Sequence, residues 1–180
     1  MANTYIYRGE VGEWAPRDVT SVIFAEGITE IHGFAFEYCK LLVSMPPFPP
    51  SLISIGYAAF YGCLSLVSLP PFPPSLTSID QYAFYNCSSL VSIPTFSPSL
   101  NSIYWHTFSN CSSLISVCIP DNTRVQPAFE LCTRLEAIAA SSNMSIIEYF
   151  GPHRRQLRVK ERVTVLLCLQ FINARRMRAR

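Results

Sequence analysis

The cysteines are the residues of this 180-residue chain whose type and spacing could do chemistry. Cys39, Cys63, Cys87 and Cys111 recur every 24 residues, and Cys132 holds the same place in a less regular copy downstream. Thiols at a fixed period can ligate a metal, form disulfides, relay electrons or pack as small apolar side chains. The residues around each cysteine decide among these roles.

The five cysteines lie in one repeated apolar pattern. In SLTSIDQYAFYNCSSLVSIPTFSP, residues 75–98, a phenylalanine stands three residues before the cysteine and a leucine three residues after it. Polar residues vary freely between these fixed positions, as they do on the surface of stacked coils that bury their apolar columns against one another. The thiols are therefore predicted to be buried and unreactive. Their Cβ vectors would run side by side, an orientation that disfavours disulfides.

Other residues that could support catalysis are scattered. His32 and His106 fall in variable columns of different coils, and His153 lies near the C-terminus. No histidine pair has the spacing of metal ligands, and there is no Cys-x-x-Cys, no glycine-rich phosphate loop and no standout nucleophile–histidine pattern. The sequence predicts a protein that is not an enzyme and needs no metal or cofactor.

The repeat resembles the BspA-type leucine-rich repeat family. The family motif Ile-x-x-x-Ala-Phe-x-x-Cys-x-x-Leu-x-x-Ile is carried here by Ile79, Ala83, Phe84, Cys87, Leu90 and Ile93, and the same registers recur over about residues 19–143. The resemblance implies a curved right-handed solenoid that serves as a protein-interaction scaffold, since many relatives are adhesins or surface proteins. We expect a leucine-rich repeat horseshoe of about five 24-residue coils, with short parallel strands, 3-10 or helical turns and a C-terminal helix.

The same pattern predicts how the chain is divided. Residues 1–18 would form an N-terminal cap or edge strand, residues 19–143 the solenoid, and residues 144–180 a basic helical cap or tail. Within a coil, the alternation in residues 66–69 indicates the inner strand, residues 57–63 a helical or 3-10 turn, and residues 75–79 a second short extended piece.

The PPFPP segments at residues 46–50 and 70–74 have two interpretations. Proline cannot donate to a strand ladder, so the segments can be stiff loops that end each inner strand, with Phe48, Phe72 and Phe96 stacked above the core edge. Alternatively they are polyproline ligands for SH3-like or WW-like domains. We favour the packing interpretation, because ending strands and making turns is the commoner use of proline.

Charge is unevenly spread over a chain whose formal net charge is +2. Residues 1–143 hold five basic and ten acidic residues, whereas residues 144–180 hold nine basic and two acidic ones. The tail either caps the last coil or binds an anionic membrane surface or nucleic acid as a basic amphipathic helix. The candidate anion-binding residues of the tail are Arg154, Arg155, Arg158, Arg175, Arg176 and Arg178. The short basic run lacks interleaved aromatics, which argues against nucleic acid.

Two faces are candidates for binding a partner. The candidate residues are Ser44, Ser68, Ser92 and Ser116 on the inner strands, and Tyr61, Tyr85 and Trp105 on the opposite side, where partial burial between coils is the alternative. No secretory signal or bilayer-spanning stretch is recognised, and seven cysteines, an odd number, favour a reducing, cytoplasmic setting. The sequence predicts a monomeric scaffold for an unknown protein partner, or alternatively peripheral anion binding through the tail.

Overall fold

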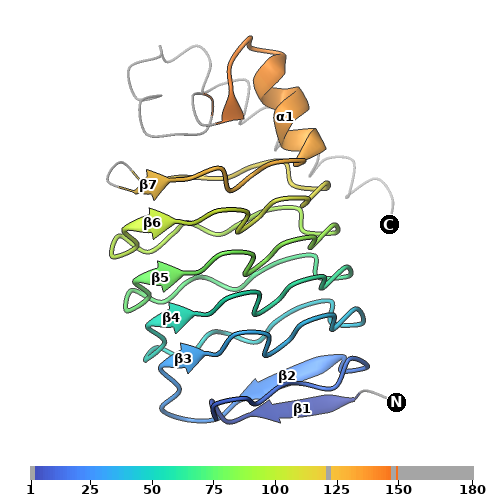
Figure 1. The fold of residues 1–180 in the computed structure, drawn as a ribbon, viewed down its shortest axis with the longest axis vertical. Coiled ribbons are helices and arrows are strands. Elements are labelled where there is room, and N and C mark those ends of the chain that lie inside the picture. The colour runs from blue at the N-terminus through green and yellow to red at the C-terminus, as the bar shows by residue number, and fades with distance from the viewer. Residues whose placement is uncertain (1–2, 121–122, 147–148, 150–180) are drawn as a thin grey trace, which may run out of the picture.

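The chain winds into a stack of coils in the computed structural model, which describes residues 3–120, 123–146 and 149 (Figure 1). At the N-terminal end, β1 (Thr4–Tyr7) and β2 (Ser21–Phe24) form a two-stranded parallel sheet. A second parallel sheet runs along the stack and consists of β3 (Glu30–Ile31), β4 (Ser54–Ile55), β5 (Ser78–Ile79), β6 (Ser102–Ile103) and β7 (Arg124–Val125). Helix α1 (Thr133–Ala140) lies beyond β7 at the C-terminal end of the stack.

Each strand of the longer sheet contributes only two residues. In β4 and β5 the isoleucine is fully buried while the serine before it is partly exposed, and like residues pair across coils, as Ile55 does with Ile79. This sheet forms where a second extended piece was expected, at residues 75–79 and their counterparts. The predicted inner strand at residues 66–69 is wrong in extent, because its column is joined only by the single bridges Ser44↔Ser68, Ser68↔Ser92 and Ser92↔Ser116. Prolines, which lack the N–H that a strand ladder needs, follow two residues after Ser44, Ser68 and Ser92 and limit pairing there.

Residues 57–63 and their counterparts form successive hydrogen-bonded turns where a helical or 3-10 turn was expected. Positive φ occurs at two positions in each of the first four coils and at one position in the fifth, and no right-handed helix accommodates it. The first column comprises Phe34, Ala58, Tyr82 and His106, and the second comprises Tyr38, Gly62, Asn86, Asn110 and Leu131. Because of these positive-φ residues, alternate N–H groups of each turn point toward the next coil. The N–H of Phe36 donates to the carbonyl of Ala59, and the N–H of Phe60 to that of Ala83, each at 2.7 Å.

Two phenylalanine ladders fill the coils. Neighbouring rings of Phe36, Phe60, Phe84, Phe108 and Phe129 are 5.0–5.6 Å apart at their centroids and nearly parallel. Their stacking extends the core through all five coils, as the fixed phenylalanine column predicts.

The second ladder belongs to the proline-rich segments. Phe48 stacks on Phe72 at 5.8 Å and Phe72 on Phe96 at 5.6 Å, and all three side chains are buried. Backbone turns close beneath them, with Leu52 donating to Pro49 and Leu76 to Pro73 at 3.0 Å. The packing interpretation of these segments is therefore confirmed, while their use as ligands stays a prediction.

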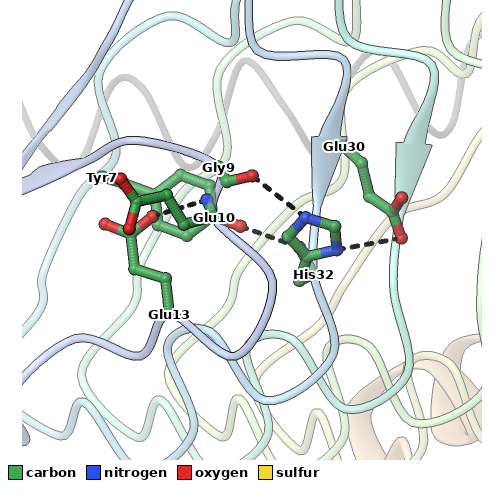
Figure 2. A network of polar contacts seen from close by, with 6 residues as sticks. All are labelled: Tyr7, Gly9, Glu10, Glu13, Glu30 and His32. Carbon is green, nitrogen blue, oxygen red and sulfur yellow. Dashed lines mark hydrogen bonds and ion pairs between the residues drawn. The ribbon is translucent and has the colours of Figure 1, made fainter.

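A polar network joins the N-terminal strands to the first coil (Figure 2). The hydroxyl of Tyr7 accepts the backbone N–H of His32 at 2.9 Å, and the His32 ring contacts the carbonyl of Gly9 at 3.0 Å and the Glu30 carboxylate at 3.4 Å. Nearby, the Glu13 carboxylate accepts N–H groups from residues 8 and 10 and the hydroxyl of Tyr5. Burial raises the pKa of Glu13, but these hydrogen bonds outweigh it and leave the pKa below its usual value.

Candidate interaction faces

The cysteine column lies in the core, as its apolar setting predicts. Cys39, Cys63, Cys87, Cys111 and Cys132 are all fully buried. Each thiol from the second coil onward donates to the carbonyl of a phenylalanine in the coil before it; Cys63 reaches Phe36 at 3.2 Å. A cysteine therefore fills a small apolar site and also gives a buried carbonyl a weak donor, which alanine could not do.

Burial strongly suppresses thiolate formation in this column. It raises the pKa of Cys39 and of Cys132 to about 12, and it raises the pKa of Cys63, Cys87 and Cys111 well above the ordinary value. Since the thiolate is the nucleophile and the metal-binding form, the column is poorly suited to either chemistry. In the part of the chain that the structure describes, no group of three His, Cys, Asp or Glu side chains is placed to hold a metal.

Thiol labelling should separate this column from Cys118, which is exposed. With Cys168, outside the described residues, replaced by alanine, we expect one thiol to label rapidly in the native chain and all six in denaturant. Because the five buried thiols react only through opening of the fold, their rates should be at least about a hundredfold below that of Cys118. The measurement is mass spectrometry after pulsed alkylation, and labelling of Cys63 or Cys87 at the rate of Cys118 would contradict the assignment.

The predicted serine face is exposed but chemically plain. Ser44, Ser68 and Ser92 are exposed and Ser116 is partly so, beside Val43 and Val67 and their counterparts. The structure does bring the four serines into one column. The side chains of this column are small, and the column contains no charged residue and no aromatic anchor. Aromatic and arginine side chains are the ones that concentrate binding energy in an interface.

The opposite side of the coils carries a continuous aromatic surface. We define the turn face as residues 34–38, 57–62, 82–86 and 104–110. Rings make contact along two rows of this face. The first row is Phe34, Tyr57, Tyr82 and His106, with centroid separations of 5.1–5.6 Å, and the second is Tyr38, Tyr61 and Tyr85, with separations of 5.3 and 5.0 Å.

Exposure within the turn face is uneven. Phe34, Tyr57 and Trp105 are 49%, 42% and 46% exposed. Tyr61 and Tyr85, two of the predicted binding residues, are partly buried against each other as stacked rings. The alternative of partial burial between coils is therefore confirmed for these tyrosines, whereas the third candidate, Trp105, stands out from the surface beside His106.

Part of the aromatic surface lies on residues of the positive-φ columns, namely Phe34, Tyr38, Tyr82 and His106, and sequence reasoning did not find these columns. Asn86 and Asn110 occupy the second column, and the Asn110 amide donates to the Asn86 side-chain oxygen at 2.8 Å. Glycine and asparagine at 24-residue spacing were the available signal, because both residues are favoured where φ is positive. The predicted binding residues of the tail, from Arg154 to Arg178, lie outside the described residues.

The match to a known protein family covers the same repeated residues. The model of the family described as "BspA type Leucine rich repeat region (6 copies)" matches residues 14–127 and 70–151. No curated protein matches the chain.

Two solved structures are similar to the chain. A T. pallidum leucine-rich repeat protein is 30% identical, with a TM-score of 0.57, over 74% of this chain and 56% of its own. A leucine-rich cell surface protein of Faecalibacterium prausnitzii A2-165 is 27% identical, with a TM-score of 0.62, over 67% of this chain and 32% of its own. The chain thus spans about half or less of the length of these two relatives. With matching family repeats, stacked parallel strands and the aligned phenylalanine, cysteine and leucine columns, the chain belongs to the BspA-type leucine-rich repeat family.

Proposed function

We propose that the chain is a non-catalytic scaffold that binds a protein partner through its turn face. The observation that carries this proposal is the continuous row of rings with three large aromatic side chains exposed at its surface. Family membership supports a repeat-based role in protein interaction or as a surface scaffold.

The turn face has the composition of an interface centre. Tryptophan and tyrosine are enriched among residues whose truncation costs most binding energy. Trp105 and Tyr57 supply such side chains at two levels of the stack, and Tyr82 and His106 connect them by ring contacts. A partner could thus bury several rings at once along one side of the molecule.

The backbone beneath these rings is already held in place. Phe34 donates to Tyr57, Ala58 to Gln81 and Tyr82 to Trp105, at 3.0–3.3 Å, so each turn is bonded to the next. Binding to such a surface costs little backbone entropy, because the loop is ordered before the partner arrives. The serine face shares the rigid backbone but lacks the anchors.

Affinity capture with matched variants tests the proposal. The variant Tyr57→Ser with Trp105→Ser removes two exposed rings of the turn face, and the control Val43→Ser with Val67→Ser removes comparable exposed apolar side chains from the serine face. All four side chains are more than a third exposed, so both variants should fold. We expect one captured protein to be retained by the control and lost by the turn-face variant.

Purified components then give the magnitude. We expect the dissociation constant for that protein to rise by about 30-fold or more in the turn-face variant, as for the loss of hot-spot residues, and to change by less than about threefold in the control. A partner lost with the serine-face variant and retained by the turn-face variant would overturn the assignment of the face. Absence of any captured protein with the intact chain would count against the scaffold function.

A further inference from the structure

The C-terminal end of the stack is left with unused backbone groups. Along the turn face, each coil donates N–H groups to carbonyls of the next: Phe84 bonds to Thr107 and Phe108 to Ala128. In the last coil the corresponding donor is Phe129, and no described residue accepts its N–H. A second series of bonds ends with Asn110 donating to the carbonyl of Glu130. The corresponding donor in the last coil is the N–H of Leu131, and no described residue accepts it either.

Acceptors are also unused at this end. On the strand side the bonds run in the opposite sense, from Asp80 to the Ile55 carbonyl and from Gln126 to the Ile103 carbonyl. The next carbonyl of that series, at Val125, receives no donor from any residue the structure describes. In addition, Oε1 of Gln126 is buried without a hydrogen-bond partner, an arrangement that native proteins rarely leave uncorrected.

Val125, Gln126 and Phe129 line a cavity, and Leu131 lies outside its lining. The cavity has a volume of about 500 Å³ and lies between the last coil and the segment that carries α1 and residues 144–146. Its walls are mainly apolar, with Val125, Ala128, Ala139 and Ile146 among them. Glu136 adds an exposed carboxylate that makes no ion pair with any described residue.

The pattern of unused groups specifies the occupant. Donors at Phe129 and Leu131 and acceptors at Val125 and Gln126 lie on one end of the stack. A polypeptide backbone supplies carbonyls and N–H groups alternately along one chain, whereas an anion or an apolar ligand supplies only one kind of contact or none. Apolar side chains are needed as well to fill the cavity.

The chain contains one segment with this chemistry just beyond the described residues. Its longest apolar run is residues 163–172, VTVLLCLQFI, and basic residues stand on both sides of it, which complements Glu136. The 13 residues from 150 to 162 can span up to about 45 Å when extended, so the run can return to the cavity next to which residue 149 ends.

We propose that residues 163–172 of this chain dock on the C-terminal end of the stack, fill the cavity with apolar side chains and satisfy the N–H groups of Phe129 and Leu131. Docking completes the hydrogen-bond ladder that the fifth coil begins. It also hides the last core of the repeat array, which an end without a cap would expose.

Amide hydrogen exchange on the full-length chain tests the docking. We expect the amides of Phe129 and Leu131 to exchange within about tenfold of the rates of Phe108 and Asn110, their bonded counterparts one coil earlier. Leu166→Asp with Leu169→Asp should speed exchange at Phe129 and Leu131 about a hundredfold and leave Phe84 and Asn86 unchanged. The matched control, Ala174→Asp with Ala179→Asp, adds the same charge outside the apolar run and should have no such effect.

Cys168, within the docked segment, provides a second readout. Its alkylation should be slow in the native chain and fast in the Leu166→Asp, Leu169→Asp variant. Exchange of Phe129 and Leu131 at unprotected rates in the native chain, or protection that both variants leave intact, would overturn the proposal. Protection that rises with protein concentration would assign the cavity to a second copy instead, and would also overturn it. Turn-face variants should not alter any of these results, so a failure here is distinct from a failure of partner binding.

Discussion

Replacing Phe84 by alanine is expected to lower the free energy of unfolding by about 3–5 kcal/mol, the usual range for a buried phenylalanine. Its side chain is fully buried in the middle coil, and its ring stacks on Phe60 at 5.0 Å and on Phe108 at 5.2 Å. The backbone on either side is bonded to neighbouring coils, Phe60 to Ala83 and Phe84 to Thr107. The coils therefore cannot close in on the space that the ring leaves.

Denaturant unfolding followed by circular dichroism measures this loss. The control is Phe34→Ala, which removes a ring of the same size that is 49% exposed, and we expect it to cost less than about 1 kcal/mol. Because each coil contacts only its neighbours, the loss at Phe84 should also separate the transition of the coils before it from that of the coils after it. Equal costs for Phe84 and Phe34 would show that the ladder does not carry the stability of the stack.

The second large effect is expected from the backbone at Ala58. This residue has a φ of 52° and donates its N–H to the carbonyl of Gln81 at 3.0 Å. Proline fixes φ near −65° and has no N–H, so Ala58→Pro should destabilise the protein by about 3 kcal/mol or more. Glycine accepts positive φ without strain, so Ala58→Gly should stabilise it by about 0.5–1 kcal/mol, in contrast to the loss normally seen for alanine to glycine.

The opposite signs of these two substitutions identify the conformation. Only Ala58→Gly removes the methyl group, which is buried, so packing alone would make that substitution destabilising too. Thermal unfolding of the two variants beside the parent chain gives the result directly. A destabilising Ala58→Gly would mean that residue 58 occupies a right-handed turn, as the sequence analysis expected for residues 57–63.

The core could be predicted from sequence because its residues repeat. Phe84, Cys87 and Leu90 recur at equal spacing in the other coils, and equal spacing implies equal positions in a stack. Burial of the cysteines and stacking of the phenylalanines follow from that register. The family, the short parallel strands and the approximate number of coils were predicted on the same grounds.

The turn conformation could not be predicted in this way. Phe34, Ala58 and Tyr82 adopt positive φ although none of them favours it as an isolated residue. The hydrogen bonds to the next coil hold them there, and those bonds exist only once neighbouring coils are aligned. Local propensity therefore indicated a helical turn that inter-coil bonding overrides.

The interaction face was only partly predictable. Tyr61, Tyr85 and Trp105 were singled out as aromatic residues, but the pattern could not tell that the first two stack on each other while Trp105 projects. Each of these three residues stands directly before a positive-φ residue, a backbone feature that the sequence analysis did not predict. The predicted roles of the tail arginines, and the cytoplasmic location, stay predictions.

The one-way hydrogen bonds of the turn face give that face an electrical polarity, opposite in sense to that of the strand side. In that face the inter-coil N–H groups point toward the C-terminal end and the carbonyls toward the N-terminal end, coil after coil. Aligned peptide dipoles add along their common axis, as they do in an α-helix, and leave partial positive charge at the end of the series, where its last donors are Phe129 and Leu131. Glu130 and Glu136 stand near that end, the place where carboxylates stabilise a dipole, and the opposite end favours cations. A charged partner bound along the turn face would therefore favour one orientation over its reverse, more strongly at low ionic strength.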